Sequence, residues 1–327
     1  MMQVFWLWLR ATLVILRNPG GIFSRFATIV TAVVTGLLWL QMDNDQTTVS
    51  DREALLFLCI MGINFPEAFA ALTVCMYFGS LSVPLLSYTH TLTNDDDDDV
   101  MMMMATIDPM ERGIYQRETE NRVYQTSAYW LGTQLAHFPL QLIAPIPFLS
   151  IVYWMSGLRV DAAKFLVFIV AVVLSSFCAN SIGLLFGALL PGQVASIVVP
   201  AVMVLLFLVG GFFLNPENMA DWLYWTRYLS WFTYTNDVLV TNEFKGESFY
   251  CKPDQYQSLS VNATCAGTME VVSNTTRTCP ITTGQQVIDF RSNDKIPIYA
   301  NVLVVFGYVL LFRCLLYFAL RFARPKA

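Results

Sequence analysis

The sequence predicts an all-α integral membrane protein with six transmembrane helices, an N-terminal interfacial helix and a long external loop between spans five and six. Two observations support this fold class. Of the 327 residues, 56% are hydrophobic and only 13% are charged, against about 25% charged in an ordinary soluble domain. The apolar residues also gather in uncharged runs, and about 20 such residues cross the hydrocarbon core of a bilayer. A soluble globule, a disordered chain and a disulfide scaffold are therefore excluded.

The N-terminal segment, residues 1–17, is predicted to be an amphipathic helix in the membrane interface. It is apolar enough to resemble a signal peptide, but it lacks a basic start. Gln3, Arg10 and Arg17 recur every seven residues and so share one helical face. The Asn-Pro-Gly-Gly run at 18–21 breaks this helix before the first span.

Six apolar segments follow as candidate spans. The Pro191-Gly192 pair separates the fourth from the fifth, and Arg313 lies inside the sixth. The predicted spans are 22–42, with an uncharged run from Phe26 to Met42, then 54–74, 128–154, 165–190, 194–214 and 298–320.

Basic residues indicate the orientation, because an even number of spans puts both termini on one side. The short loops on the opposite side hold only Arg52, Arg159 and Lys164. Nine basic residues lie on the side of the termini: Arg10, Arg17, Arg25, Arg112, Arg117, Arg122, Arg321, Arg324 and Lys326. By the positive-inside rule we expect cytosolic termini and an external loop at 215–297, in the plasma membrane or another membrane of the secretory pathway.

The predicted external loop carries signs of an oxidising, glycosylating compartment. Asn262 and Asn274 begin glycosylation sequons. Cys251, Cys265 and Cys279 are disulfide candidates in the same loop. Because three is odd, one thiol either pairs between chains or stays free and buried.

Sites for catalysis and for metal are not predicted on this chain. No Gly-Lys pair occurs, so the phosphate-binding loop GxxxxGK[ST] is absent and the chain by itself is not expected to hydrolyse ATP. The cysteines have no CxxC spacing, and only two histidines occur, so no metal site or cofactor is expected. The net charge of -5 includes the five-aspartate run from Asp95 to Asp99, so no attraction to nucleic acid follows.

Few ionisable residues lie inside the spans. They are Glu67, His137 and Arg313. A proton-coupled carrier generally uses a longer relay, so this class is disfavoured. Each of the three is equally well explained as a helix-packing or snorkelling residue.

A charged cytosolic segment, 108–127, alternates acids and bases and is predicted to contact a partner surface. A plain solvated loop is the simpler explanation. The run from Glu111 into SAY, followed by a Pro-containing span that ends in IVYWMSGL, resembles the membrane domain of G-subfamily (White-type) ATP-binding-cassette transporters. The stretch NMADWLYWTRYLSWFTYTNDVLVTNEFKGESFYC, 218–251, resembles the same family after its fifth span. The resemblance covers nearly the whole chain.

The resemblance implies a half-transporter that works as a homo- or heterodimer of six-span domains. Each half is driven by a nucleotide-binding domain that holds ATP and Mg. In the family this domain precedes the membrane part, whereas here residue 1 stands where the connecting helix begins. We therefore expect a nucleotide-binding domain either upstream in the same chain or on a separate subunit, with membrane lipid as a further partner and no nucleic acid.

The resemblance also implies roles for individual residues. Phe65, Val204 and Phe207 would line a flat apolar cavity at the dimer axis, and Phe212 and Phe213 would form its external gate. Without the resemblance, such phenylalanines are expected to face lipid or to pack. The coupling segment, 108–127, would contact the nucleotide-binding domain and transmit its movement to the membrane helices through Glu111, Arg112, Arg117, Glu118 and Tyr124.

Residues 75–106 interrupt the family pattern with a Ser/Thr-rich stretch and the run DDDDDVMMMM. Asp and Met tracts side by side are what the repeat GATGAT yields in two reading frames. We interpret this insert as translated repeat or retained intron sequence; a disordered acidic loop is the alternative.

The sequence thus predicts the substrate-translocating half of an ATP-driven exporter of hydrophobic or amphipathic compounds, such as lipids, sterols or xenobiotics. Two alternatives are a truncated fragment that only dimerises and an ion-coupled secondary carrier.

Overall fold

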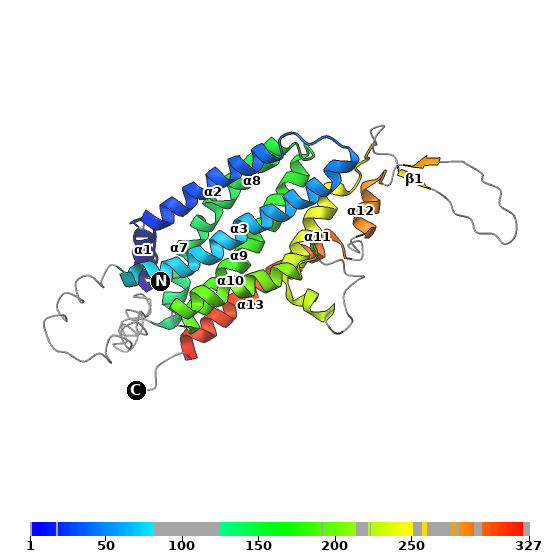
Figure 1. Cartoon of the computed structure of the whole chain (residues 1–327). Coiled ribbons are helices and arrows are strands. Elements are labelled where there is room, and N and C mark those ends of the chain that lie inside the picture. Colours follow the sequence, from blue (N-terminus) through cyan, green and yellow to red (C-terminus); the bar gives the residue numbers. More distant parts are fainter. Residues whose placement is uncertain are drawn as a thin grey trace, which may run out of the picture.

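The computed structural model describes residues 2–17, 19–80, 125–190, 192–213, 222, 224–250, 257–259, 276–278, 281–290 and 296–322. These residues form a bundle of helices with a small two-stranded ribbon at one end (Figure 1). Helices α1 and α13 place both termini at the same end of the bundle, which we call the termini end. The opposite end, near the ribbon, is called the distal end.

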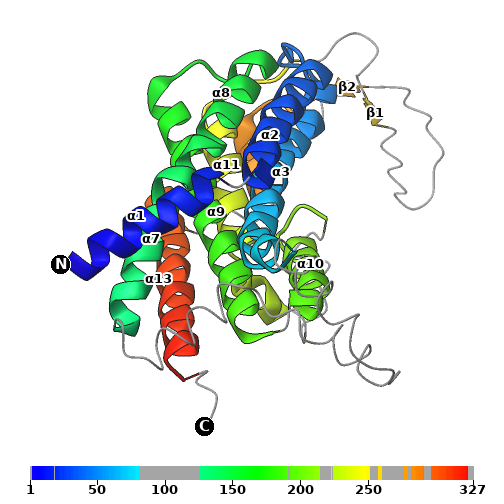
Figure 2. The same ribbon diagram turned by 90° about the vertical axis from the view of Figure 1, so that its left-hand side faces the viewer.

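The first three helices form one side of the bundle. Helix α1 (Met2–Arg17) lies across the long axis of the bundle and packs on α7, where its backbone passes close to Gly132 (Figure 2). Helix α2 (Pro19–Leu38) follows, and α3 (Gln46–Ser80) returns from the distal end. Asp45 helps to start α3, because its Oδ1 accepts the N–H of Thr47 at 2.9 Å.

The third predicted span consists of two helices, α7 (Thr126–Ile143) and α8 (Pro145–Ser156). Pro145 at the start of α8 has no N–H to continue the ladder of α7, which explains the break at Ala144. Helix α9 (Ala162–Leu189) runs through the centre of the bundle, and α10 (Gly192–Leu208) follows it. The fifth span is thus shorter than the predicted 194–214: the Gly210 N–H bonds to the Phe207 carbonyl at 2.9 Å, and Gly211 has a φ of 92°.

The predicted external loop contains more helix than the sequence indicated. A short 3₁₀-helix, η2 (Tyr224–Leu229), leads into α11 (Trp231–Phe244), which packs against α3, α9 and α13. Strands β1 (Gln257–Leu259) and β2 (Thr276–Thr278) pair antiparallel, and α12 (Gly284–Phe290) precedes α13 (Ile298–Phe322).

Four helical stretches within the described chain are long and apolar enough to cross a membrane. They are Thr47–Ala71, Ser127–Ser156, Ala162–Leu189 and Ile298–Arg321. Two shorter apolar helices, Phe26–Leu38 and Val194–Leu208, lie where the first and fifth spans are predicted. The all-α membrane fold is therefore confirmed.

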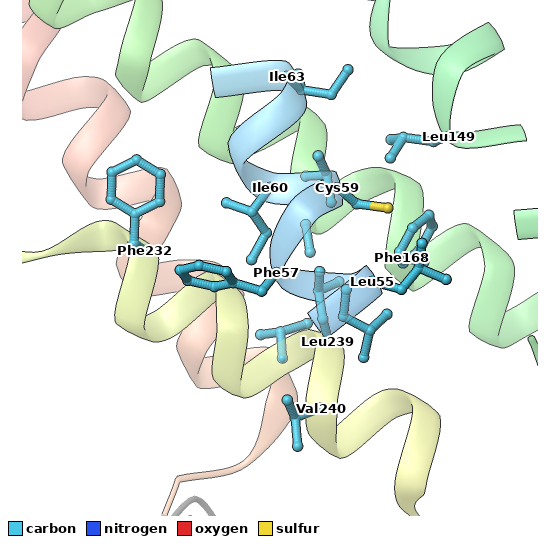
Figure 3. Close-up of a cluster of buried hydrophobic side chains, with 14 of the residues drawn as sticks. Leu55, Phe57, Cys59, Ile60, Ile63, Leu149, Phe168, Phe232, Leu239 and Val240 are labelled. Atoms are coloured by element: carbon cyan, nitrogen blue, oxygen red, sulfur yellow. The ribbon is translucent and has the colours of Figure 1, made fainter. Parts of the chain in front are cut away.

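Helices α3 and α9 form the centre of the core. A Cβ atom added to Gly183 on α9 would lie 2.6 Å from the Ala68 carbonyl oxygen of α3 and 2.8 Å from the Ala71 Cβ. Only glycine permits this approach, which resembles the small-residue contacts of membrane helices. Toward the distal end, Phe57 of α3 points toward Phe232 of α11, and Cys59 on the other side of α3 lies near Phe168 of α9 (Figure 3).

Candidate functional site

Six phenylalanine rings from three parts of the chain form an aromatic cluster on one side of α3. The cluster consists of Phe57 and Phe65 on α3, Phe207 on α10, Phe212 and Phe213 just after α10, and Phe232 on α11. Phe57 is at its centre. Its ring centroid lies 4.1 Å from that of Phe207 and 4.3 Å from that of Phe212, with which it stacks at 15°. Phe57, which sequence reasoning did not select, thus contacts three of the residues predicted for the cavity and gate, and Phe65 joins the cluster through Phe207.

Exposure divides the cluster into a buried floor and an accessible edge. Phe57, Phe207 and Phe232 are buried, with at most 5% of each residue exposed. Phe65 is half-buried, and Phe213 is 57% exposed. The rings of Phe65 and Phe207 meet edge to face at 6.1 Å, a favoured geometry for aromatic pairs. Within this single chain Phe207 therefore packs inside the core, whereas Phe65 and Phe212 are partly exposed and Phe213 is exposed.

Val204, the third predicted cavity residue, lies on an outward apolar face. It is 43% exposed on α10, one helical turn before Phe207. Ile197 and Leu208 share its face of α10, and Leu58 and Phe69 are exposed on the neighbouring α3. Contiguous apolar surface of this kind faces either lipid or a second protein surface in a membrane.

A buried polar link fixes α11 beside the aromatic cluster. The Trp231 Nε1–H donates to the Oδ1 of Asn64 on α3 at 3.4 Å, and the Ser175 hydroxyl of α9 donates to the same oxygen at 3.0 Å. All three residues are fully buried. An asparagine inside an otherwise apolar span is the only sequence signal for this link, and it does not name the partners.

A second cluster lies at the distal end, around the last turn of α11. We call it the distal polar cluster; its members are Arg52, Arg159, Lys164, Glu243 and Glu247. Arg52 on α3 forms an ion pair with Glu243 at 2.9 Å, and both residues are at least 97% buried. The Arg159 backbone N–H donates to the same Glu243 oxygen at 3.3 Å.

The remaining contacts of the distal polar cluster join the α8–α9 turn to the end of α11. The Lys164 ammonium and the Arg159 guanidinium both donate to the Lys245 carbonyl at 3.1 Å. Carbonyl oxygens at a helix C-terminus favour such cations. Burial raises the pKa of the Glu243 carboxyl, and the neighbouring Arg52 charge opposes this rise. The sequence identified Arg52, Arg159 and Lys164 as the cations of the predicted external side, but it did not indicate that they meet two glutamates.

Several predicted site residues lie outside the described residues. These are the coupling residues Glu111, Arg112, Arg117, Glu118 and Tyr124, the sequon residues Asn262 and Asn274, and the candidates Cys251, Cys265 and Cys279. Elsewhere in the described chain, Cys59, Cys178 and Cys314 are free thiols. The described part of the chain holds no group of three or more His, Cys, Asp or Glu residues arranged for a metal ion.

Comparison with known proteins shows a similarity to one family of transporters. Residues 100–244 match the model of the ABC-2 type transporter membrane domain. Protein white of Ceratitis capitata is 29% identical over 271 residues, which cover 82% of this chain and 34% of that protein. Protein white of Drosophila melanogaster is 28% identical over 98% of this chain and 39% of its own length.

The relatives extend beyond insects. ABC transporter G family member 1 of Dictyostelium discoideum is 26% identical over 294 residues, 88% of this chain and 31% of that protein. The chain is similar to the transmembrane domains of G-subfamily ABC transporters. It spans about a third of the length of the curated relatives that it matches.

Proposed function

We propose that this chain is the substrate-translocating half of an ATP-driven exporter of hydrophobic or amphipathic compounds. It works as a dimer, and each half is driven by a nucleotide-binding domain that binds ATP and Mg. The domain itself binds and releases cargo in the membrane and performs no chemistry on it.

The aromatic cluster is the observation that carries this proposal. Two accessible rings, Phe65 and Phe213, rest on a floor of buried rings around Phe57. Aromatic walls without fixed charge favour flat apolar cargo, because such a ligand gains affinity from contact area and stacking. Phe212 and Phe213 follow directly after the turn that ends α10, a position from which they can close the cluster toward the distal end.

The partners follow from two surfaces. The outward apolar face that carries Val204, Leu58 and Phe69 receives the second half-transporter, so that two aromatic clusters flank one cavity. The segment 108–127 transmits the conformational change of the nucleotide-binding domain to the membrane helices. Its charged and aromatic residues are Glu111, Arg112, Arg117, Glu118 and Tyr124. The termini are cytosolic in this arrangement, in the plasma membrane or another secretory-pathway membrane, and the distal end is external. The sequence segment 215–297, with Asn262, Asn274, Cys251, Cys265 and Cys279, is the external loop.

The test is ATP-dependent transport by the domain joined to a G-subfamily nucleotide-binding domain and reconstituted in lipid vesicles. Uptake of a fluorescent amphiphile into inside-out vesicles measures activity, with and without ATP. We expect Phe65→Ala to lower the transport rate about tenfold, which corresponds to a loss of about 1.4 kcal/mol of binding. The matched control is Phe306→Ala, because Phe306 is 47% exposed on α13 and lies outside the aromatic cluster.

Each outcome separates the proposal from its alternatives. Transport that needs ATP and is lowered by Phe65→Ala but not by Phe306→Ala supports the exporter. Dimerisation without any ATP-dependent uptake would identify a fragment that only associates. Uptake that survives ATP depletion but collapses with the proton gradient would identify an ion-coupled carrier.

A further inference from the structure

Arg313 is a charged side chain near the middle of the helical bundle. It belongs to α13, and its Nη2 donates to the Oε1 of Gln141 on α7 at 3.3 Å. Its guanidinium carbon lies 6.0 Å from the centroid of the Phe177 ring on α9. Helix α13 stands between α7 and α9 at this side of the bundle (Figure 2).

The contacts of Arg313 fix its depth. Gln141 lies near the middle of the span Ser127–Ser156, and Phe177 lies near the middle of Ala162–Leu189. The guanidinium is therefore held close to mid-depth of the bundle. A snorkelling side chain would instead extend toward the termini end, where α13 ends. The structure thus excludes snorkelling, one of the two explanations that the sequence left open.

The charge of Arg313 is not balanced by a carboxylate among the described residues. Its recorded contacts there are an amide oxygen and the face of an aromatic ring. A cation at this depth in a membrane is costly, and such residues generally pair or bind a ligand. An amide oxygen offers hydrogen bonding but no compensating charge.

Gln141 carries a buried amide donor that is not satisfied by the described residues. This residue is 2% exposed, and its Nε2 is buried without a hydrogen-bond partner among the described residues. Its Oε1 is already engaged by Arg313. Within the part of the chain that the structure describes, an unmet amide donor therefore lies next to a guanidinium without a counter-ion. Buried donors without acceptors are costly, and an oxyanion is the acceptor that satisfies an amide and a guanidinium together.

The side chains around Arg313 and Gln141 indicate that such an oxyanion would reach them from the lipid. Phe138, whose ring stacks on Phe177 at 5.6 Å and 21°, is 56% exposed. Leu310, one turn from Arg313 on α13, is 51% exposed. The donors are thus bordered by apolar side chains on the lipid-facing surface of the bundle.

We propose that Arg313 and Gln141 bind the oxyanion of an amphiphile that enters from the lipid, with its apolar tail against Phe138 and Leu310. The oxyanion is a carboxylate or a phosphate. This site is separate from the aromatic cluster of α3 and α10, and it does not depend on the proposed transport.

Binding is tested on the purified chain in nanodiscs of phosphatidylcholine at about pH 9, where fatty carboxylates are ionised. The probes are spin-labelled stearate, its uncharged methyl ester and spin-labelled phosphatidate. The immobilised fraction in the electron paramagnetic resonance spectrum measures binding. We expect the wild-type chain to prefer the charged probes over the ester about tenfold, the scale of one charge-assisted hydrogen bond. The probe with the higher affinity identifies the source, carboxylate or phosphate.

Two variants locate the site. Arg313→Gln removes the positive charge. Gln141→Glu keeps the arginine and replaces the amide with a carboxylate of similar shape, which serves as a counter-ion for Arg313 inside the protein. Both variants are expected to abolish the preference for charged probes. Because Gln141→Glu keeps Arg313, a loss of preference in this variant does not come from misfolding caused by removal of the arginine. Arg321→Gln is the matched control, since Arg321 is an exposed arginine near the end of the same helix. Equal binding of charged and uncharged probes by the wild type, or a preference that persists in Gln141→Glu, would overturn the proposal.

Discussion

The two ends of α11 are held by different physical interactions. At its first turn, Trp231 and Phe232 lie against aromatic rings and the buried Asn64. At its last turn, Glu243 is clamped by the Arg52 guanidinium and the Arg159 backbone N–H. The first environment depends on shape and area, which tolerate adjustment, whereas the second depends on charges that must be matched. The distal polar cluster therefore fixes the position of α11, whereas the packing of the aromatic cluster tolerates adjustment.

Removing one partner of the buried ion pair is expected to have the largest effect on stability, and it tests the difference between the two ends of α11. Arg52→Met leaves Glu243 buried and uncompensated, and we expect it to lower the free energy of unfolding by about 4 kcal/mol. Thermal unfolding of the purified chain in detergent measures the effect. The control is Arg159→Met, because the Arg159–Glu247 pair is partly exposed, with 35% of the Arg159 side chain accessible, and should cost about 1 kcal/mol or less.

A double variant tests the cause. Arg52→Met combined with Glu243→Leu removes both charges and should recover most of the lost stability, since neither charge remains unpaired. Equal losses for Arg52→Met and Arg159→Met would contradict the distinction between a buried and an exposed pair.

The next largest effect is expected in the aromatic cluster. Phe57 is 4% exposed and contacts three other rings of the cluster. Phe57→Ala should destabilise the chain by about 3 kcal/mol, because it leaves a cavity under Phe207 and Phe212. Phe213→Ala, at a ring that is 57% exposed, should change the stability by less than about 0.5 kcal/mol. Similar losses at both positions in thermal unfolding would rule out the division into floor and edge.

The smallest expected effect concerns Asp237, which lies on α11 between the two clusters. Its Oδ2 is 3.6 Å from the Arg227 Nη2, and burial raises the pKa of this carboxyl while the arginine opposes the rise. A carboxyl with a higher pKa in the folded than in the unfolded chain holds its proton longer when folded. Its contribution to stability is therefore present at low pH and is lost as the pH rises through the folded-state pKa.

We accordingly expect the unfolding temperature to fall between about pH 4 and about pH 7, and to fall less in Asp237→Asn. The asparagine keeps the shape of the side chain but does not titrate. A slope that is unchanged in the variant would assign the pH dependence to another group.

Apolar segments found in the sequence coincide with helices of the structure, because hydropathy is a sum over neighbouring residues. The spans at 165–190 and 298–320 coincide with α9 and α13 within a few residues. Differences arise where single residues act on the backbone. Pro145 divides the third span into α7 and α8, and Gly210-Gly211 ends α10 early, so that Phe212 and Phe213 follow a turn instead of closing a helix.

The candidate site was predicted only in part. The resemblance selected Phe65 and Phe207, yet composition alone did not separate them from lipid-facing phenylalanines, and Phe57 was missed. In a membrane the lipid is as apolar as the protein interior, so apolar periodicity does not tell which face of a helix is buried. Helix α11 was missed because its buried face includes polar residues such as Asn236 and Glu243, which are typical of loops.

The sequence by itself determined that this chain is an apolar membrane domain, which family it resembles and where its long apolar segments lie. These properties depend on residues that are close together in the chain. The tertiary structure alone decided that Arg52 meets Glu243, 191 residues away, that Phe57 joins the cluster, and that Arg313 lies beside Gln141. Such pairs arise from the packing of helices, and packing depends on the shapes of side chains from distant segments, which no local pattern records.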